Sequence, residues 1–139
     1  MSTKVFQNQK YQTCIDACNG CFEACEACAT ECLREQDVKI MTECIQLCRE
    51  CAEICASSSK LMSMDSGYVK QVCSLCADVC DACSRECGKQ QKMEHCKLCA
   101  QVCRRCVEEC RKVVGYTQQH ENGERIVSII FVSCFQPLN

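Results

Sequence analysis

Cysteine is the residue type with the greatest chemical capacity in this sequence, at 21 of 139 positions. Its thiolate form is a nucleophile and a soft metal ligand. Within four clusters the spacing between consecutive cysteines alternates strictly between three and four residues. So many thiols at so regular a spacing predict either metal binding or thiol redox chemistry. The clusters are Cys14, Cys18, Cys21, Cys25, Cys28 and Cys32; Cys44, Cys48, Cys51 and Cys55; Cys73, Cys76, Cys80, Cys83 and Cys87; and Cys96, Cys99, Cys103, Cys106 and Cys110.

This spacing is the a/d pattern with which an α-helix presents one seam to its neighbours. The four clusters therefore predict four helices, near residues 5–34, 38–62, 66–87 and 91–114. The connections between these helices are short, and short connections make consecutive helices antiparallel neighbours. We expect an all-α protein, an antiparallel up-down-up-down four-helix bundle, whose cysteine stripes line one shared core.

Apolar residues stand directly beside many of the cysteines, Phe22, Leu75 and Leu98 among them. The pattern predicts that they widen the buried stripe of each helix. Without cysteine, the apolar content would make a thin core, and a thiol can fill such a core as a small, soft hydrophobic group.

The sequence after the fourth cluster has a different character. Residues 1–114 are predicted to form the bundle and residues 115–139 a C-terminal extension, flexible or without a functional role. The run from Ile126 to Val132 is typical of a strand. Cys134 is the one cysteine outside the clusters, and we expect it to take no part in metal chemistry.

Charge and hydropathy exclude some partners. The net charge of −2 gives no electrostatic reason to expect nucleic acid or an anionic membrane. No stretch approaches the roughly 20 apolar residues of a membrane span. The segment from Met1 to Asn8 lacks the apolar region of a secretory signal. The expected location is thus the cytoplasm, where clustered cysteines are more often ligands than disulfides.

The spacing itself argues against disulfides and for a metal. Cβ atoms three or four residues apart on a helix are separated by about 5–6 Å, whereas a relaxed disulfide needs about 3.8 Å. If the metal–sulfur bond is about 2.3 Å, a two-coordinate ion spans sulfurs roughly 4.5 Å apart. A CxxC or CxxxC pair can reach that separation by small side-chain rotations. Leu or Ile would bury more apolar area at these positions, so the sulfurs must have a task.

Charge favours one metal among those that thiolates select, which are Cu(I), zinc and iron–sulfur clusters. Zinc held by four thiolates keeps two excess negative charges, which are costly in a buried core. The Cys-Pro that ends the bacterial ferredoxin motif is absent. A Cu(I) ion replaces one thiol proton and leaves the core neutral, as Ag(I) would. Multiple Cu(I) ions per chain are therefore expected, and a zinc or Fe–S protein or a thiol-redox buffer is the alternative.

Helical runs such as the cluster from Cys14 to Cys32 resemble those of the bacterial copper storage proteins. The resemblance covers residues from about 5 to 114. It implies a four-helix bundle that stores Cu(I) on its core cysteines, and a homotetramer. The lack of an export signal resembles the cytosolic branch of that family.

Three further residues are candidates for metal access. Met41 begins the second predicted helix, and Met93 and His95 begin the fourth. In an antiparallel bundle these helix ends meet beside Cys32 and Cys87, so weaker thioether and imidazole donors could pass copper inward. The sequence contains no catalytic constellation, and we do not expect an enzyme.

Overall fold

The computed structural model describes the backbone of residues 10–135 and the side chains of residues 10–115. Four α-helices account for most of it: α1 (Gln12–Leu33), α2 (Thr42–Ser63), α3 (Val69–Gly88) and α4 (Glu94–Phe135). A short 3-10 helix, η2 (Val38–Met41), leads into α2. No strand occurs within residues 10–135. The all-α prediction is confirmed.

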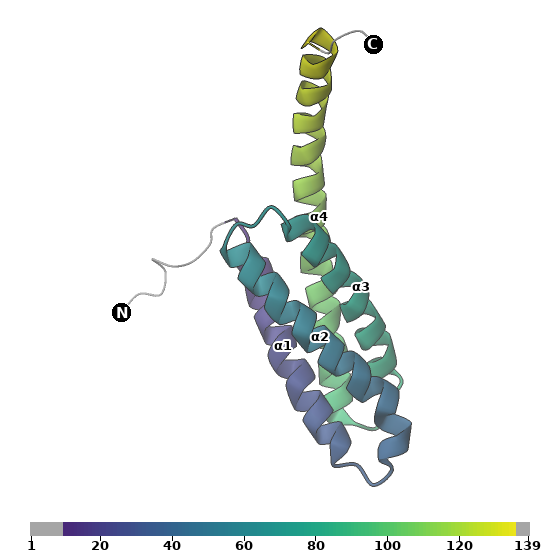
Figure 1. Ribbon diagram of the computed structural model, residues 1–139. Helices are drawn as coiled ribbons and strands as arrows, with labels where there is room; N and C mark the ends of the chain where they lie inside the picture. Colours follow the sequence, from purple (N-terminus) through teal and green to yellow (C-terminus); the bar gives the residue numbers. More distant parts are fainter. Residues whose placement is uncertain (1–9, 136–139) are drawn as a thin grey trace, which may run out of the picture.

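The helices form an antiparallel bundle in which each packs against the two beside it (Figure 1). The contacts are α1 with α2, α2 with α3, α3 with α4, and α4 back to α1, which closes the ring. Residues 34–37, 64–68 and 89–93 are the short connections that keep consecutive helices adjacent. The predicted up-down-up-down order is therefore confirmed, and the predicted helix limits hold to within a few residues except at the two ends of the chain.

At the N-terminus, α1 begins at Gln12, and residues 10 and 11 form a turn. The earlier start predicted near residue 5 lies outside the described residues.

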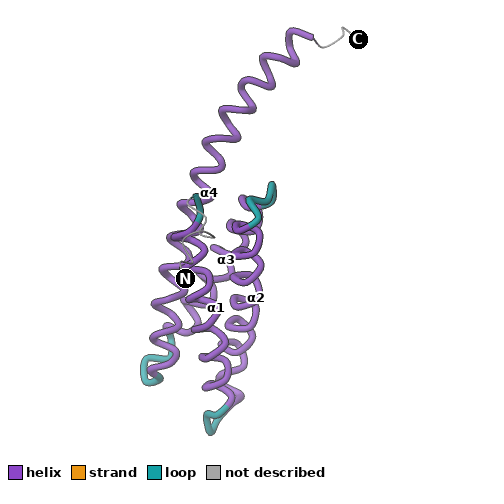
Figure 2. Tube along the Cα trace, turned by 90° about the vertical axis from the view of Figure 1, so that its left-hand side faces the viewer, coloured by secondary structure: helices purple, strands orange, loops and turns teal. Residues whose placement is uncertain are grey.

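At the C-terminus, α4 continues well past the predicted end near residue 114. Beyond Gly115 it runs out of the bundle as a single helix, past the ends of the other three (Figures 1 and 2). The strand-like interpretation of Ile126–Val132 is wrong, because these residues are helical. Extending a formed helix adds one hydrogen bond for each residue fixed, and the first proline of the sequence is Pro137. The side chain of Cys134 lies outside those described.

The turn after α2 is built around Asp65, the one non-glycine residue in the described part of the chain with a positive φ, at 50°. The backbone N–H of Asp65 donates to the carbonyl of Met62, and the N–H of Ser66 donates to that of Leu61. These two bonds form the Schellman arrangement that closes a helix C-terminus. They stop α2 sharply and let α3 return beside it.

The outer layer differs from expectation at several large apolar side chains. Phe22, Leu75 and Leu98 are 40%, 52% and 58% exposed, so they do not widen the buried stripe as predicted. Successive helix positions are turned by about 100° from one another, and a long side chain next to a seam position can therefore face the solvent. Within the described residues, no helix has the length and apolar character required to cross a bilayer.

Candidate metal centre

All twenty cysteines of the four clusters point into the bundle, and none is more than 2% exposed. The strict three/four spacing explains this, because it keeps every thiol on the one face of its helix that meets the other three. All twenty are free thiols. The absence of disulfides within residues 10–115 agrees with the sequence-based argument about helical geometry.

The thiols of different helices lie in direct contact. The closest pairs are Cys51 with Cys80, at 3.1 Å between Sγ atoms, and Cys44 with Cys87, at 3.3 Å. Cys55 lies 3.5 Å from Cys80, which is a third contact between α2 and α3. A two-coordinate Cu(I) needs sulfurs about 4.5 Å apart, so small outward shifts of these thiols would admit the ion.

Contacts within one helix follow the longer of the two spacings. Among the described cysteines, the intrahelical pairs with Sγ atoms within 4.0 Å are all four residues apart, at 3.8–3.9 Å. The CxxC pairs, whose cysteines are three residues apart, make no such contact. This follows from the 3.6-residue turn and the side-chain directions on a helix. The CxxC cysteines therefore find their nearest sulfurs mainly on neighbouring helices.

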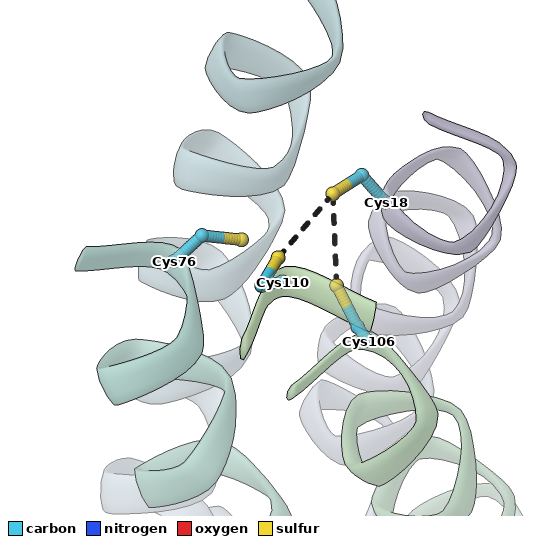
Figure 3. A group of neighbouring side chains, drawn as sticks. All are labelled: Cys18, Cys76, Cys106 and Cys110. Atoms are coloured by element: carbon cyan, nitrogen blue, oxygen red, sulfur yellow. Dashed lines mark hydrogen bonds between the residues drawn. The ribbon is translucent and has the colours of Figure 1, made fainter. Parts of the chain in front are cut away.

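The contacts organise the core into groups of four thiols whose Sγ atoms lie within 4.8 Å of one another. In one of them, Cys18 of α1 lies 3.7 Å from Cys106 and 3.9 Å from Cys110 of α4, while Cys76 approaches from α3 (Figure 3). Each of the five groups named below takes its thiols from at least three helices. Five such groups are Cys18, Cys76, Cys106 and Cys110; Cys21, Cys55, Cys80 and Cys106; Cys21, Cys25, Cys51 and Cys103; Cys25, Cys48, Cys83 and Cys99; and Cys28, Cys32, Cys44 and Cys96.

These groups overlap. Cys106, Cys21 and Cys25 each belong to two of them, so four groups are linked in sequence by a shared sulfur. Cys87 continues the row, because it lies 3.6 Å from Cys48 and 3.3 Å from Cys44. The core is thus a continuous row of thiols along the bundle. Such a row suits several soft metal ions with bridging sulfurs better than one isolated ion.

The protonation of the thiols depends on burial and on their mutual hydrogen bonds. Burial raises the pKa of Cys32 to about 11, and it is also the main cause of the raised pKa of Cys96. By contrast, a hydrogen bond with the Cys110 thiol lowers the pKa of Cys106 to about 7. Thiols such as Cys32 carry their protons at neutral pH, so a metal ion that binds there must displace them.

At one end of the bundle, α1 and α3 end where η2 and α4 begin, and we call this end the mouth. His95 lies there with its Nε2 atom 3.6 Å from the Sγ of Cys32 and 3.9 Å from a carboxylate oxygen of Glu35. Met41 is fully buried, and Met93 packs partly buried against the core. His95 therefore contacts the thiol row at Cys32, while Met41 belongs to the buried core and Met93 packs against that core.

Glu35 was not singled out by the sequence reasoning. It lies three residues after Cys32, in the first connection, and its side chain is half-buried beside His95. Its sequence position gives a weak signal at best, since an acidic residue in a short connection is most often a solvated one.

The family comparison agrees with this geometry. Residues 7–115 match the family model described as copper storage protein. The chain belongs to the copper storage protein family. The match ends where α4 leaves the bundle, so the helical segment after residue 115 lies outside the region that defines the family.

Solved structures of copper storage proteins share the fold. The Cu(I)-bound copper storage protein BsCsp3 is 46% identical, with a TM-score of 0.73 over 76% of this chain and 99% of that one. Apo copper storage protein 3 from Bacillus subtilis is 48% identical, with a TM-score of 0.70 over 74% and 97% of the two chains. A cytosolic copper storage protein from Streptomyces lividans, with five coppers, is 37% identical, with a TM-score of 0.74 over 77% and 93%. No protein of the curated set matches the chain.

Proposed function

We propose that this chain stores Cu(I), many ions per molecule, on the twenty cysteines of its core. The observation that carries the proposal is the row of overlapping thiol groups, in which neighbouring sets share Cys21, Cys25 and Cys106. Shared sulfurs can bridge copper ions, and Cu(I) bound near one per thiolate keeps a buried core neutral. The function is storage and not catalysis, in keeping with the family to which the chain belongs.

The test is an anaerobic titration of the reduced full-length protein with Cu(I), in competition with a chromophoric chelator. We expect uptake of many equivalents, approaching the number of core cysteines. Saturation at one or two equivalents would instead indicate a carrier with a single site. Zinc should bind in far smaller amount and leave free thiols, because each zinc adds excess negative charge to the core. A brown, iron-bearing preparation would favour the Fe–S alternative.

Copper is proposed to pass through the mouth, with Met41, Met93 and His95 as transient donors. The contact between His95 and Cys32 supports this path, because it joins a partly exposed imidazole to the thiol row. Neutral thioether and imidazole groups hold Cu(I) less firmly than a set of thiolates, and they can therefore release it inward or outward.

The variant Met41→Leu/Met93→Leu/His95→Phe tests this path. It should keep the fold and most of the final capacity, but load copper and lose it to a chelator more slowly. Met64→Leu/His120→Phe is a matched control, because the side chain of Met64 is exposed and position 120 lies on the part of α4 beyond the bundle. Equal rates for the triple variant and the parent would show that the three residues serve packing alone.

Two features of the working protein are proposed with the storage function: a cytoplasmic location and a homotetrameric assembly. The large exposed apolar side chains Phe22, Leu75 and Leu98 support self-association, since such groups are commonly covered at interfaces. Light scattering coupled to size exclusion measures the mass of the particle, and a monomer at micromolar concentration would contradict the assembly. Fractionation of cells that express the full chain checks the location.

A further inference from the structure

A second opening to the thiol row lies at the end of the bundle opposite the mouth. A surface pocket with a volume of about 190 Å³ lies between the start of α1 and α4. Lys10, Thr13, Cys14, Glu109 and Lys112 contribute to its wall. We call it the Cys14 pocket. Cys14 is 2% exposed, the largest fraction among the twenty core cysteines, most of which are completely covered.

The pocket connects directly to the copper-binding row. The Sγ of Cys14 lies 3.7 Å from that of Cys110, which lies 3.9 Å from Cys18. From Cys18 the next steps are 3.7 Å to Cys106 and 3.8 Å onward to Cys55. No step exceeds the reach of a Cu(I) ion exchanged between two sulfurs about 4.5 Å apart. An ion accepted by Cys14 is therefore one transfer away from Cys110. A few further transfers bring it to the middle of the core.

The charge around the pocket differs from that at the mouth. Its wall holds two lysines against one glutamate, and Lys112 pairs with Glu109 at 3.1 Å. Lys10 lies 3.6 Å from Asp65, outside the wall, and its Nζ sits 5.0 Å from the ring centre of Tyr11. The wall residues alone therefore carry one more positive than negative charge, because the carboxylate that pairs with Lys10 belongs to Asp65, outside the wall. At the mouth, by contrast, the carboxylate of Glu35 faces His95.

We propose that the Cys14 pocket is a second copper-exchange site, which accepts Cu(I) from anionic complexes with small thiols. The proposal rests on the storage function assigned to the thiol row. In the exchange step, the bond between copper and the carrier sulfur breaks as a bond between copper and the Sγ of Cys14 forms. The proton of the Cys14 thiol passes to the departing carrier thiolate. Copper stays Cu(I), so no electron moves.

Alkylation of the reduced, copper-free protein tests the opening independently of storage. Iodoacetamide is neutral and iodoacetate is anionic, and peptide mass spectrometry gives the rate at each cysteine. We expect Cys14 to react faster than the fully covered Cys21. The ratio of its rate with iodoacetate to its rate with iodoacetamide should also be higher than the same ratio for Cys32. The variant Lys10→Glu/Lys112→Glu should remove that preference. If Cys14 reacts as slowly as Cys21, the pocket does not open to the row and the proposal fails, whatever copper the protein stores.

Copper transfer from the Cu(I)–glutathione complex tests the exchange. The pair Lys10→Glu/Lys112→Glu is added to the variant Met41→Leu/Met93→Leu/His95→Phe, in which transfer through the mouth is already slowed. The added pair should slow the transfer by about threefold or more, because the anionic carrier is no longer attracted. The control is Lys39→Glu/Lys97→Glu, which makes the same charge change near the mouth. Slowing by the pocket pair and not by the control supports the second site. An unchanged rate with the pocket pair, or equal slowing by both pairs, overturns it.

Discussion

The two halves of α4 belong to one continuous helix but differ in almost every other respect. The first half carries five cysteines from Cys96 to Cys110, all buried in the core of the bundle. The second half, beyond Gly115, carries no such repeat and leaves the bundle alone (Figures 1 and 2). The difference shows that a helix can continue by backbone hydrogen bonding alone. Its side chains are buried, and can share in the chemistry of the core, only where their spacing lets the helix pack against neighbouring helices.

The largest effect is expected from removing one group of four core ligands. The variant Cys25→Ser/Cys48→Ser/Cys83→Ser/Cys99→Ser takes one thiol group out of the middle of the row. Copper capacity should fall by about four equivalents, because serine oxygen is a poor ligand for Cu(I). Anaerobic titration measures the capacity. Cys134→Ser is the matched control from the second half of α4, and a comparable loss there would erase the distinction between the halves.

The next effect concerns alkaline pH and the copper-free protein. Because burial raises the pKa of Cys32 from 9.0 to about 11, the folded state keeps this proton where the unfolded state loses it. The stability from this group is therefore fully present below pH 9 and is lost as the pH rises through 11. Urea unfolding followed by circular dichroism from pH 8 to 11 should show the decline.

The copper-loaded protein is the control for the pH series, because its thiol protons have already been displaced. A decline of the same size with copper bound would mean that the thiols are not responsible.

A smaller effect is expected at the contact between α3 and the first half of α4. The hydroxyl of Ser84 is buried, donates to the carbonyl of Ala100 at 3.0 Å, and accepts from Arg104 at 3.2 Å. Ser84→Ala should lower the free energy of unfolding by about 1 kcal/mol, as is usual for a lost intramolecular hydrogen bond. Ser74→Ala, an exposed position on α3, corrects for the better helix propensity of alanine. If chemical denaturation finds the two variants equally stable, the hydrogen bonds of Ser84 do not stabilise the contact between α3 and α4.

The smallest effect is expected from deleting the second half of α4. A chain that ends at Gly115 keeps all twenty core cysteines and the whole region that matches the family. Its copper capacity should equal that of the full chain, and its thermal midpoint should shift little. Parallel titrations and melting curves provide the measurement. A marked loss of capacity would assign the distal segment a role in storage.

The sequence predicts the first half of α4 and the other bundle helices well, because twenty cysteines repeat one period without interruption. This period determines the helices, their shared core and the inward direction of every thiol. The distal segment is mispredicted for the opposite reason. The β-branched residues between Ile126 and Val132 indicate a strand only where partners exist to pair with it, and a local sequence does not show whether a helix already precedes it.

Details of the site were less accessible from the sequence. The preference of thiol contacts for the CxxxC spacing depends on side-chain directions, and the pairing of Cys51 with Cys80 depends on how two helices are aligned. At the end of the bundle opposite the mouth, Tyr11 and Met62 are buried, whereas Met64 is 66% exposed. The left-handed turn at Asp65 follows Met64 directly and carries the chain away from the core.

The three short connections have a kinetic consequence. Since they make each helix the neighbour of the next, most of the packing joins segments close in sequence, and only the contact of α1 with α4 closes a long loop. Helical proteins of such low contact order fold in about microseconds to milliseconds. Disulfide formation takes roughly seconds to hours, depending on the oxidant and the isomerase. A newly made chain can therefore enclose its thiols before disulfides form, so that the speed of folding protects the cysteines until copper arrives.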